Sequence, residues 1–283
     1  MTTSAQDPSA QDPMTQPSSA PRPAGTPAWI DLTAHDLECA LRFYGDLFGW
    51  TFDDLGEEAG HYRHALVDGR PVAGFMQAMD PSGAPVGPQA MPATWTVYLA
   101  SDSLEETAEA VTAAGGRVEV GRVDISDLGR SLYVADAAGA QVGLWEAREF
   151  PGFASIGGVG EPAWFECMSS DALVAEQFYR DALGWEISVM PGSGEGGFWY
   201  ATNGAGEAAS AGLCDASSFV PRGESGWWRM YIAVEDADAA AERVRELGGS
   251  LLDGPIDSPF GRVATVADPE SASFQIIQQP ARG

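Results

Sequence analysis

Over residues 29–33 (WIDLT), the aliphatic residues Ile30 and Leu32 alternate with Trp29, Asp31 and Thr33. Side chains of a strand point alternately to its two faces, so this pattern predicts a strand with two different faces. Over residues 37–48 apolar residues recur every three or four positions, which predicts an amphipathic helix. Asp36 suits the N-cap of this helix, and Gly49 suits the left-handed residue after its last turn. Further strands are predicted at 51–54, about 61–67 and 72–78.

A second unit of the same kind follows a loop rich in proline and glycine. Residues 94–100 alternate as a strand, and an apolar stripe over 104–111 predicts a second helix. Gly115 and Gly116 end that helix. Three more strands are predicted, at 117–120, 131–135 and 141–145.

The whole plan then returns in the second half of the chain. The segment FYGDLFGW at 43–50 matches FYRDALGW at 178–185, an offset of 178 − 43 = 135. Trp95 matches Trp228 at an offset of 228 − 95 = 133. The second half is therefore slightly shorter between matching positions, and we expect the missing residues to lie in loops. Such matches indicate a tandem duplication. The predicted organisation is a disordered tail (1–26), a first domain (27–147), a glycine-rich linker (148–161) and a second domain (162–280).

Composition and charge exclude several classes of protein. The formal net charge is −26 and every basic residue is arginine, which disfavours nucleic acid as a partner because phosphate binding needs a basic surface. No apolar run is long enough to span a membrane, and the N-terminus lacks a basic segment followed by an apolar one. Three cysteines without metal-ligand spacing indicate buried thiols. We therefore expect a cytoplasmic protein.

The order of these elements resembles a known family. A strand, a helix ending in FYxxxxGW, three strands, and then a second unit whose helix ends in GG are similar to the vicinal oxygen chelate superfamily. That superfamily includes glyoxalase I, bleomycin and fosfomycin resistance proteins and extradiol dioxygenases. The resemblance implies an α+β fold of four βαβββ units, in which each domain curls eight strands into an open cup. The concave face of the cup is then the expected ligand site.

The same resemblance implies where a divalent metal would be bound. The superfamily holds its metal with His, Gln or Glu side chains of the cup strands. At the matching positions this chain carries tryptophan, threonine, glycine and arginine, which are poor or impossible metal ligands, and one glutamine. That glutamine, Gln275, is the only residue of the set able to coordinate a metal. We therefore expect neither a metal nor another cofactor, and we expect the three histidines, which match no ligand position, to face solvent or to bond locally. The matching positions are Trp29, Thr96 and Gly143 in the first domain, and Trp164, Arg229 and Gln275 in the second.

Each predicted cup contains one carboxylate, Asp31 or Glu166, among aromatic residues. Such a carboxyl group, with a pKa raised by its surroundings, could act as a general acid or base while a tyrosine stabilises an oxyanion. Alternatively, Glu166 forms a structural ion pair with Arg229 on the neighbouring strand. Thr96 replaces that arginine beside Asp31. The candidate catalytic residues are Asp31, Glu166, Tyr98 and Tyr231, and the candidate binding residues are Trp29, Thr96, Trp145, Trp164, Arg229 and Gln275.

Three functions follow from these residues. The first is a metal-independent protein that binds an aromatic or polyketide-like small molecule, as in antibiotic resistance by sequestration. The second is a metal-independent isomerase or lyase of secondary metabolism that uses Asp31 or Glu166. The third is a glyoxalase-like lyase with unusual metal ligands. A buried, unpaired Asp31 facing an open cavity favours catalysis, whereas an Asp31 closed off by hydrogen bonds favours binding alone. Either a monomer or a homodimer is compatible with the tandem repeat.

Overall fold

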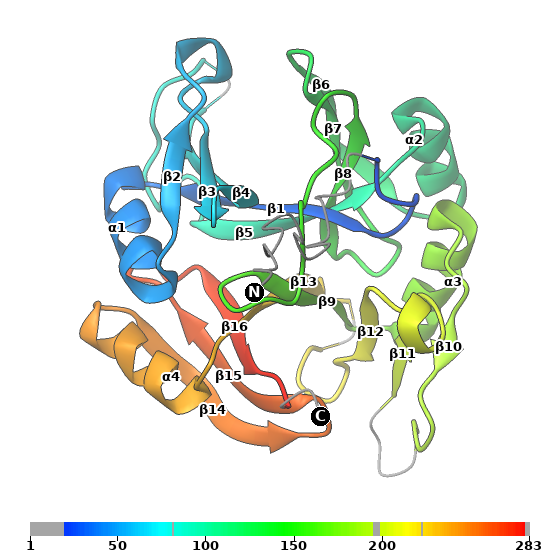
Figure 1. The fold of residues 1–283 in the computed structure, drawn as a ribbon. Coiled ribbons are helices and arrows are strands. Elements are labelled where there is room, and N and C mark those ends of the chain that lie inside the picture. The colour runs from blue at the N-terminus through cyan, green and yellow to red at the C-terminus, as the bar shows by residue number, and fades with distance from the viewer. Residues whose placement is uncertain (1–19, 81, 195–198, 222, 281–283) are drawn as a thin grey trace, which may run out of the picture.

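A computed structural model describes residues 20–80, 82–194, 199–221 and 223–280. Its fold is α+β and consists of two curved eight-stranded sheets, neither of which closes into a barrel. The sheets lie back to back, with β5 of one near β13 of the other and the helices at the two sides (Figure 1). Their concave faces therefore point away from each other. The predicted pair of open cups is confirmed.

The first sheet joins two βαβββ halves side by side. Strands β1 (Pro27–Ala34) and β5 (Thr94–Ala100) pair antiparallel at its centre. Helices α1 (Leu37–Phe48) and α2 (Leu104–Ala113) each follow one of these strands. In sheet order the strands are β2 (Thr51–Asp54), β3 (Arg63–Val67), β4 (Arg70–Gln77), β1, β5, β8 (Gln141–Ala147), β7 (Gly129–Ala135) and β6 (Arg117–Ile125).

The second sheet repeats this arrangement. Strands β9 (Pro162–Ser169) and β13 (Trp227–Ala233) pair antiparallel at its centre and precede α3 (Ala172–Leu183) and α4 (Ala237–Glu246). Short 3₁₀ helices lie in loops of both halves, η1 at Glu57–Ala59 and η3 at Gly206–Ala208. In sheet order the strands are β10 (Ser188–Val189), β11 (Tyr200–Thr202), β12 (Gly212–Asp215), β9, β13, β16 (Ser273–Gln278), β15 (Gly261–Ala267) and β14 (Ser250–Ser258).

The local signals in the sequence act as predicted at the ends of α1. The Asp36 side chain accepts a hydrogen bond from the Cys39 backbone N–H, and Gly49 adopts a left-handed conformation with φ of 72°. The largest difference concerns β6, predicted over 117–120 but continuing to Ile125. β6 is an exposed edge strand, and its pairing with β7 continues beyond the predicted end through two shifts of register.

The predicted tail divides into two parts. Residues 1–19 lie outside the described residues. Residues 20–26 contact the fold, because the Gly25 N–H donates to the Ala100 carbonyl at 2.8 Å and the Trp185 indole donates to the Gly25 carbonyl at 2.8 Å. The end of the predicted tail therefore packs against both halves of the chain.

The FYxxxxGW motif holds the two sheets together. In α1 the Tyr44 hydroxyl donates to Asp268 of the second half at 3.2 Å and accepts from the Trp95 indole at 2.8 Å. The arrangement is repeated in α3, where the Tyr179 hydroxyl donates to Asp136 of the first half at 3.0 Å. Burial raises the pKa of Asp136, although its hydrogen bonds act in the opposite direction. The motif is thus part of the interface between the halves.

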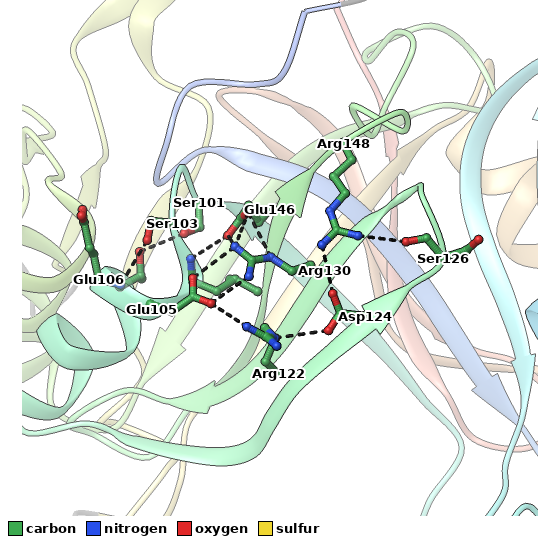
Figure 2. Close-up of polar contacts among 12 residues, drawn as sticks. Ser101, Ser103, Glu105, Glu106, Arg122, Asp124, Ser126, Arg130, Glu146 and Arg148 are labelled. Carbon is green, nitrogen blue, oxygen red and sulfur yellow. Dashed lines mark hydrogen bonds and ion pairs between the residues drawn. The ribbon is translucent and has the colours of Figure 1, made fainter.

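A network of charged side chains connects α2 to the first sheet (Figure 2). The Arg130 guanidinium lies between Glu105 and Glu146, and Glu146 also accepts the Leu104 N–H at 2.9 Å. Gln278 accepts the N–H of Ala237 at the equivalent place in the second half. Partly exposed ion pairs of this kind each contribute little to the free energy of folding. We therefore infer that the network serves mainly to position α2 on the sheet.

No helix among the described residues is long and apolar enough to cross a membrane.

We expect Tyr179→Phe to lower the free energy of unfolding by about 2 kcal/mol. The substitution deprives buried Asp136 of a donor and leaves the buried Trp228 indole N–H without its acceptor. Guanidinium denaturation followed by tryptophan fluorescence and circular dichroism measures the change. The control is Glu176→Gln on the same helix, which breaks a surface pair with Arg180 and should change stability by less than about 0.5 kcal/mol. Equal stabilities of Tyr179→Phe and the wild type would contradict this role.

Candidate functional site

One row of cross-strand neighbours carries Asp31 across the first cup. Asp31 pairs with Gly74 of β4 and Thr96 of β5, and Gly74 in turn pairs with His64 of β3. Directly paired residues share a face of the sheet. The opposite face carries residues such as Trp95, which bonds to α1. The row therefore lies on the face turned away from the helices, which is the concave one.

A second row runs parallel to the first. Trp29 pairs with Tyr98, Tyr98 with Gly143 of β8, and Gly143 with Tyr133 of β7. Trp29 lies two residues from Asp31 on β1 and hence on the same face. The two rows together form the floor of the first cup.

Asp31 is a buried carboxylate held by tyrosine hydroxyls. Its side chain accepts hydrogen bonds at Oδ2 from Tyr98 at 2.9 Å and Tyr62 at 3.3 Å, and the residue is only 3% exposed. Oδ1 is buried without a hydrogen-bond partner among the described residues. Burial raises the pKa of the Asp31 carboxyl to about 7, although the hydrogen bonds from Tyr98 and Tyr62 act in the opposite direction. Asp31 therefore changes charge near neutral pH.

Two glycines make room for these tyrosines. A Cβ atom at Gly74 would overlap the Tyr62 hydroxyl, and one at Gly143 would overlap the Tyr98 ring. Glycine inside a strand often marks such a close approach. Tyr62 was missed by the sequence analysis, which placed it inside the strand predicted at about 61–67, whereas β3 begins at Arg63 and Tyr62 reaches Asp31 from the residue before it. Its oxygen also accepts the Trp29 indole N–H at 2.9 Å.

Tyr133 extends the site outward and was also missed. Its hydroxyl contacts the Tyr98 hydroxyl, and its side chain is partly exposed, whereas Tyr98 is buried. Burial, followed by the charge of Asp31, raises the pKa of Tyr133 far above neutrality, so this phenol keeps its proton. Its place becomes evident only once the pairing of β7 with β8 is known.

The linker supplies an aromatic wall to the first cup. Phe150 stacks on the His64 ring, with ring centroids 5.0 Å apart, and meets Trp29 edge-on at 4.8 Å. The Trp145 indole donates to the Phe150 carbonyl at 2.9 Å, which places this candidate residue beside the wall. A segment predicted as a spacer thus lines the candidate site.

The expectation for the histidines is wrong for His64. Burial lowers the pKa of His64 to about 4, so its imidazole is neutral at pH 7 within the aromatic wall. His61 instead lies before β3 and contacts Asp54 at 3.1 Å, as expected for a locally bonded residue. His35 bonds the Val86 carbonyl at 3.1 Å.

The second cup contains a similar but neutralised centre. Glu166 accepts hydrogen bonds from Tyr200 at 2.7 Å and Tyr231 at 2.8 Å, and the Trp164 indole donates to Tyr200 at 2.8 Å. The predicted ion pair is present, because the Arg229 guanidinium donates twice to Glu166 Oε2, at 2.9 and 2.6 Å. A charged partner and two tyrosines therefore satisfy this carboxylate.

Three of the positions that differ between the cups change the surroundings of the carboxylate and its tyrosines. Arg229 of the second cup occupies the place of Thr96, and Gln275 occupies that of Gly143. Thr265 replaces Tyr133 and donates to the Gln275 side-chain oxygen at 2.7 Å. The first cup is therefore the one with an unneutralised carboxylate linked to an outer tyrosine.

The residues at the family's metal positions do not fit a divalent metal. The Trp29 and Trp164 indoles are donors only, and both are bonded to tyrosines. Gly143 has no side-chain ligand, and Gln275 uses its oxygen to accept from Thr265. In the parts of the chain that the structure describes, no group of three His, Cys, Asp or Glu side chains is placed to hold a metal ion.

Two hollows bordered by described residues lie away from both carboxylates. One, of about 570 Å³, opens between the halves near Arg117 and Ser170. The other, of about 210 Å³, borders Trp145 and Arg22. Asp31 thus meets two of the conditions that favour catalysis, burial and the lack of a charged partner, but it is enclosed by tyrosines and faces neither hollow.

Comparison with known proteins identifies relatives over most of the chain. The Glyoxalase/Bleomycin resistance protein/Dioxygenase superfamily pattern matches residues 26–144, and a Glyoxalase-like domain matches residues 164–277. The provisionally named glyoxylase CFP32 of Mycobacterium bovis is 35% identical, covering 90% of this chain and 95% of its own. The anthracycline biosynthesis protein DnrV of Streptomyces peucetius is 34% identical, covering 90% and 93%.

A solved structure shares the fold. The Mn(II)-bound glyoxalase from Novosphingobium aromaticivorans superposes with a TM-score of 0.58, covering 90% of this chain and 82% of its own, at 13% sequence identity. At this identity the likeness concerns the fold alone.

We expect opposite effects of neutralising the two carboxylates at pH 8. Asp31 binds its proton more tightly in the folded protein than in the unfolded chain, since its pKa rises from 3.8 to about 7 on folding. The folded protein therefore loses stability as the pH rises between these two values. Asp31→Asn should therefore stabilise the protein at pH 8, by roughly 2–4 kcal/mol, and flatten this pH dependence. Denaturant titrations from pH 4 to pH 8 measure both.

The matched variant in the second cup is Glu166→Gln. It leaves the largely buried Arg229 guanidinium without its counter-ion and should destabilise the protein by about 3 kcal/mol. A loss of stability in Asp31→Asn as large as that in Glu166→Gln would show that Asp31 is also a satisfied structural charge.

Proposed function

Because the chain belongs to the glyoxalase/bleomycin resistance protein/dioxygenase superfamily, we propose that it binds a flat aromatic small molecule in its first cup without a bound metal. The observation that carries this proposal is the set of partly exposed aromatic side chains around Asp31, for which the described residues supply tyrosine donors but no cation. His64, Phe150 and Tyr133 are each partly exposed on this side of the sheet. Rings of this kind supply contact area, while a few polar groups orient the ligand.

The donor set supports metal independence. Trp29, Thr96 and Gly143 stand where the family places its ligands, and none of them suits a divalent cation. The carboxylate that lies nearby, Asp31, is bonded to two tyrosines. Ligand selection in this cup then depends on shape, on ring stacking and on hydrogen bonding.

The relatives support the class of ligand. Two proteins whose names refer to anthracycline biosynthesis, from Streptomyces, are 33% and 34% identical along 90% of this chain. Anthracyclines contain a flat, hydroxylated polycyclic quinone, which suits a cup walled by aromatic rings. A polycyclic phenol or quinone is therefore the ligand class that we assign to the first cup.

The difference between the cups supports the choice of the first one. In the second cup, Arg229 and Gln275 occupy space on the floor, and Glu166 already has four hydrogen-bond donors. We assign Trp164, Arg229 and Gln275 to a mainly structural centre.

Exchanging one residue between the cups tests this choice. We expect Thr96→Arg to place a guanidinium against Asp31 and to weaken binding of 2-hydroxyanthraquinone at least tenfold, about 1.4 kcal/mol or more. The reverse change, Arg229→Thr, should leave this affinity within about threefold. Quenching of tryptophan fluorescence measures both dissociation constants, and melting curves show that each variant is folded.

Two results would contradict the assignment. Loss of binding in Arg229→Thr with retention in Thr96→Arg would place the ligand in the second cup. Loss of binding after dialysis against a chelator, with recovery on adding a divalent metal, would favour a metal-dependent function.

A second candidate function is acid–base catalysis by Asp31, with Tyr98 stabilising an oxyanion. The specific observation in its favour is a pKa of about 7, because a general base works best when its pKa lies near the working pH. Tyr98 donates directly to Asp31 and is buried, so the two groups already form a pair.

Exchange of carbon-bound hydrogen tests this candidate. With 1-tetralone in D₂O, we expect the wild type to accelerate deuterium incorporation next to the carbonyl, and Asp31→Asn to lose at least about 100-fold of that acceleration. Proton NMR follows the exchange, and Thr265→Val in the second cup serves as the control. A wild-type rate equal to that of buffer, with binding intact, would leave the protein a binder only.

A further inference from the structure

Three hydroxyl and carboxyl groups form a continuous chain from the buried floor of the first cup to its partly exposed side. Asp31 Oδ2 accepts from Tyr98, and the Tyr98 hydroxyl contacts that of Tyr133. We propose that Tyr133 contacts a hydroxyl group of the ligand and relays its proton through Tyr98 to the Asp31 carboxylate. This proposal rests on the proposed binding function of the first cup and adds a route between the ligand and the buried Asp31 carboxylate.

The direction of the hydrogen bonds follows from the number of protons. A tyrosine hydroxyl has one hydrogen, and that of Tyr98 points to Asp31 when the carboxylate is ionised. The contact between the two hydroxyls must then be donated by Tyr133. The Tyr133 oxygen consequently remains an acceptor toward the cup. With Asp31 protonated, the chain can reverse, and Tyr133 becomes a donor toward the cup.

The other neighbour of Asp31 does not offer such a route. Tyr62 accepts the Trp29 indole N–H and donates to Asp31, and indole is a donor only. This fixes the direction of the Tyr62 hydroxyl in both protonation states. Thr96 and His64 share the Asp31 row, and the low pKa of His64 keeps it neutral at the pH where Asp31 titrates.

The proton balance of the relay is closed. The O–H bond of the ligand breaks and its proton bonds to the Tyr133 oxygen. The former Tyr133 proton moves to Tyr98, and the former Tyr98 proton moves to Asp31 Oδ2. The products are a ligand oxyanion that accepts from Tyr133 and a neutral Asp31. Both tyrosines end as they began, and no other reactant is needed.

The second cup provides an internal comparison. Thr265 stands in the place of Tyr133 and donates to Gln275, not to Tyr231. Glu166 is neutralised by Arg229. The duplicated scaffold therefore retains the inner tyrosines without the outer member of the chain, which identifies Tyr133 as a feature of the first cup.

A titration without ligand tests the coupling between Tyr133 and Asp31. Infrared spectra across pH 5–9 follow the protonated carboxyl band that Asp31→Asn abolishes. We expect Tyr133→Phe to raise the midpoint by about half to one pH unit, because Tyr98 loses the donor that strengthens its bond to the carboxylate. Tyr98→Phe should raise it further, and Thr265→Val should leave it unchanged. An unchanged midpoint in Tyr133→Phe overturns the relay.

A titration with 2-hydroxyanthraquinone tests the proton transfer itself. Its visible absorption moves to longer wavelength when its single phenol ionises. We expect the wild-type complex to ionise at a lower pH than the free dye, and the Asp31 carboxyl band to persist in the complex to a higher pH than in the protein without dye. In Tyr133→Phe the dye should still bind, but its ionisation should return toward that of the free dye by about one pH unit.

The two proposals fail differently. Binding with an ionisation midpoint that is the same in the wild type and in Tyr133→Phe overturns the relay and leaves the binding function intact. A dye that does not bind the wild type counts against the proposed ligand class, and the ligand-free titration then decides the relay. Melting curves of Tyr133→Phe, which keeps its ring, show that the fold is retained.

Discussion

The whole architecture depends on two buried hydrogen bonds that cross between the halves of the chain. Tyr44 donates to Asp268, and Tyr179 donates to Asp136. Each carboxylate lies in a turn between two strands of the other half, so one of its hydrogen bonds is donated from across the interface. Because the helices pack at this interface, they do not cover the concave faces, which point outward (Figure 1). The FYxxxxGW motif therefore contributes to the orientation of the two cups.

The duplication gave two cups that share a floor but differ in charge. Both carry a tryptophan, two tyrosines and a carboxylate in the same relation. The second adds Arg229, which turns a buried negative charge into a satisfied ion pair. The first keeps Asp31 without a cation, and this difference carries the functional assignment.

Much of the fold follows from the sequence because its signals are local. Alternation located β1 and β5, and capping residues located the ends of α1. The family resemblance, aligned on the repeated motifs, also placed Thr96 beside Asp31 and Arg229 beside Glu166, and both pairings are present in the structure. These pairings supplied the central part of the candidate site.

The rest of the site depends on contacts between distant segments. Tyr62 reaches Asp31 from outside a strand, and Tyr133 is linked to Asp31 only through the Tyr98 hydroxyl. Phe150 approaches from a segment whose glycines suggested a spacer. No periodicity within one segment contains such information, although glycine at a strand interior, as at Gly74, is a signal of close approach.

The wall contributed by Phe150 has a consequence for how the halves are studied. The linker also bonds both halves, since the Gly160 carbonyl accepts from Trp50 of the first half and the Gly160 N–H donates to the Ala233 carbonyl of the second at 2.8 Å. A fragment ended at the last strand of the first sheet would expose the Trp29 and His64 rings and lose their cover. Dissecting the chain into single domains would thus create an artificial, wider cup, and ligands selected with such a fragment would not report on the intact protein.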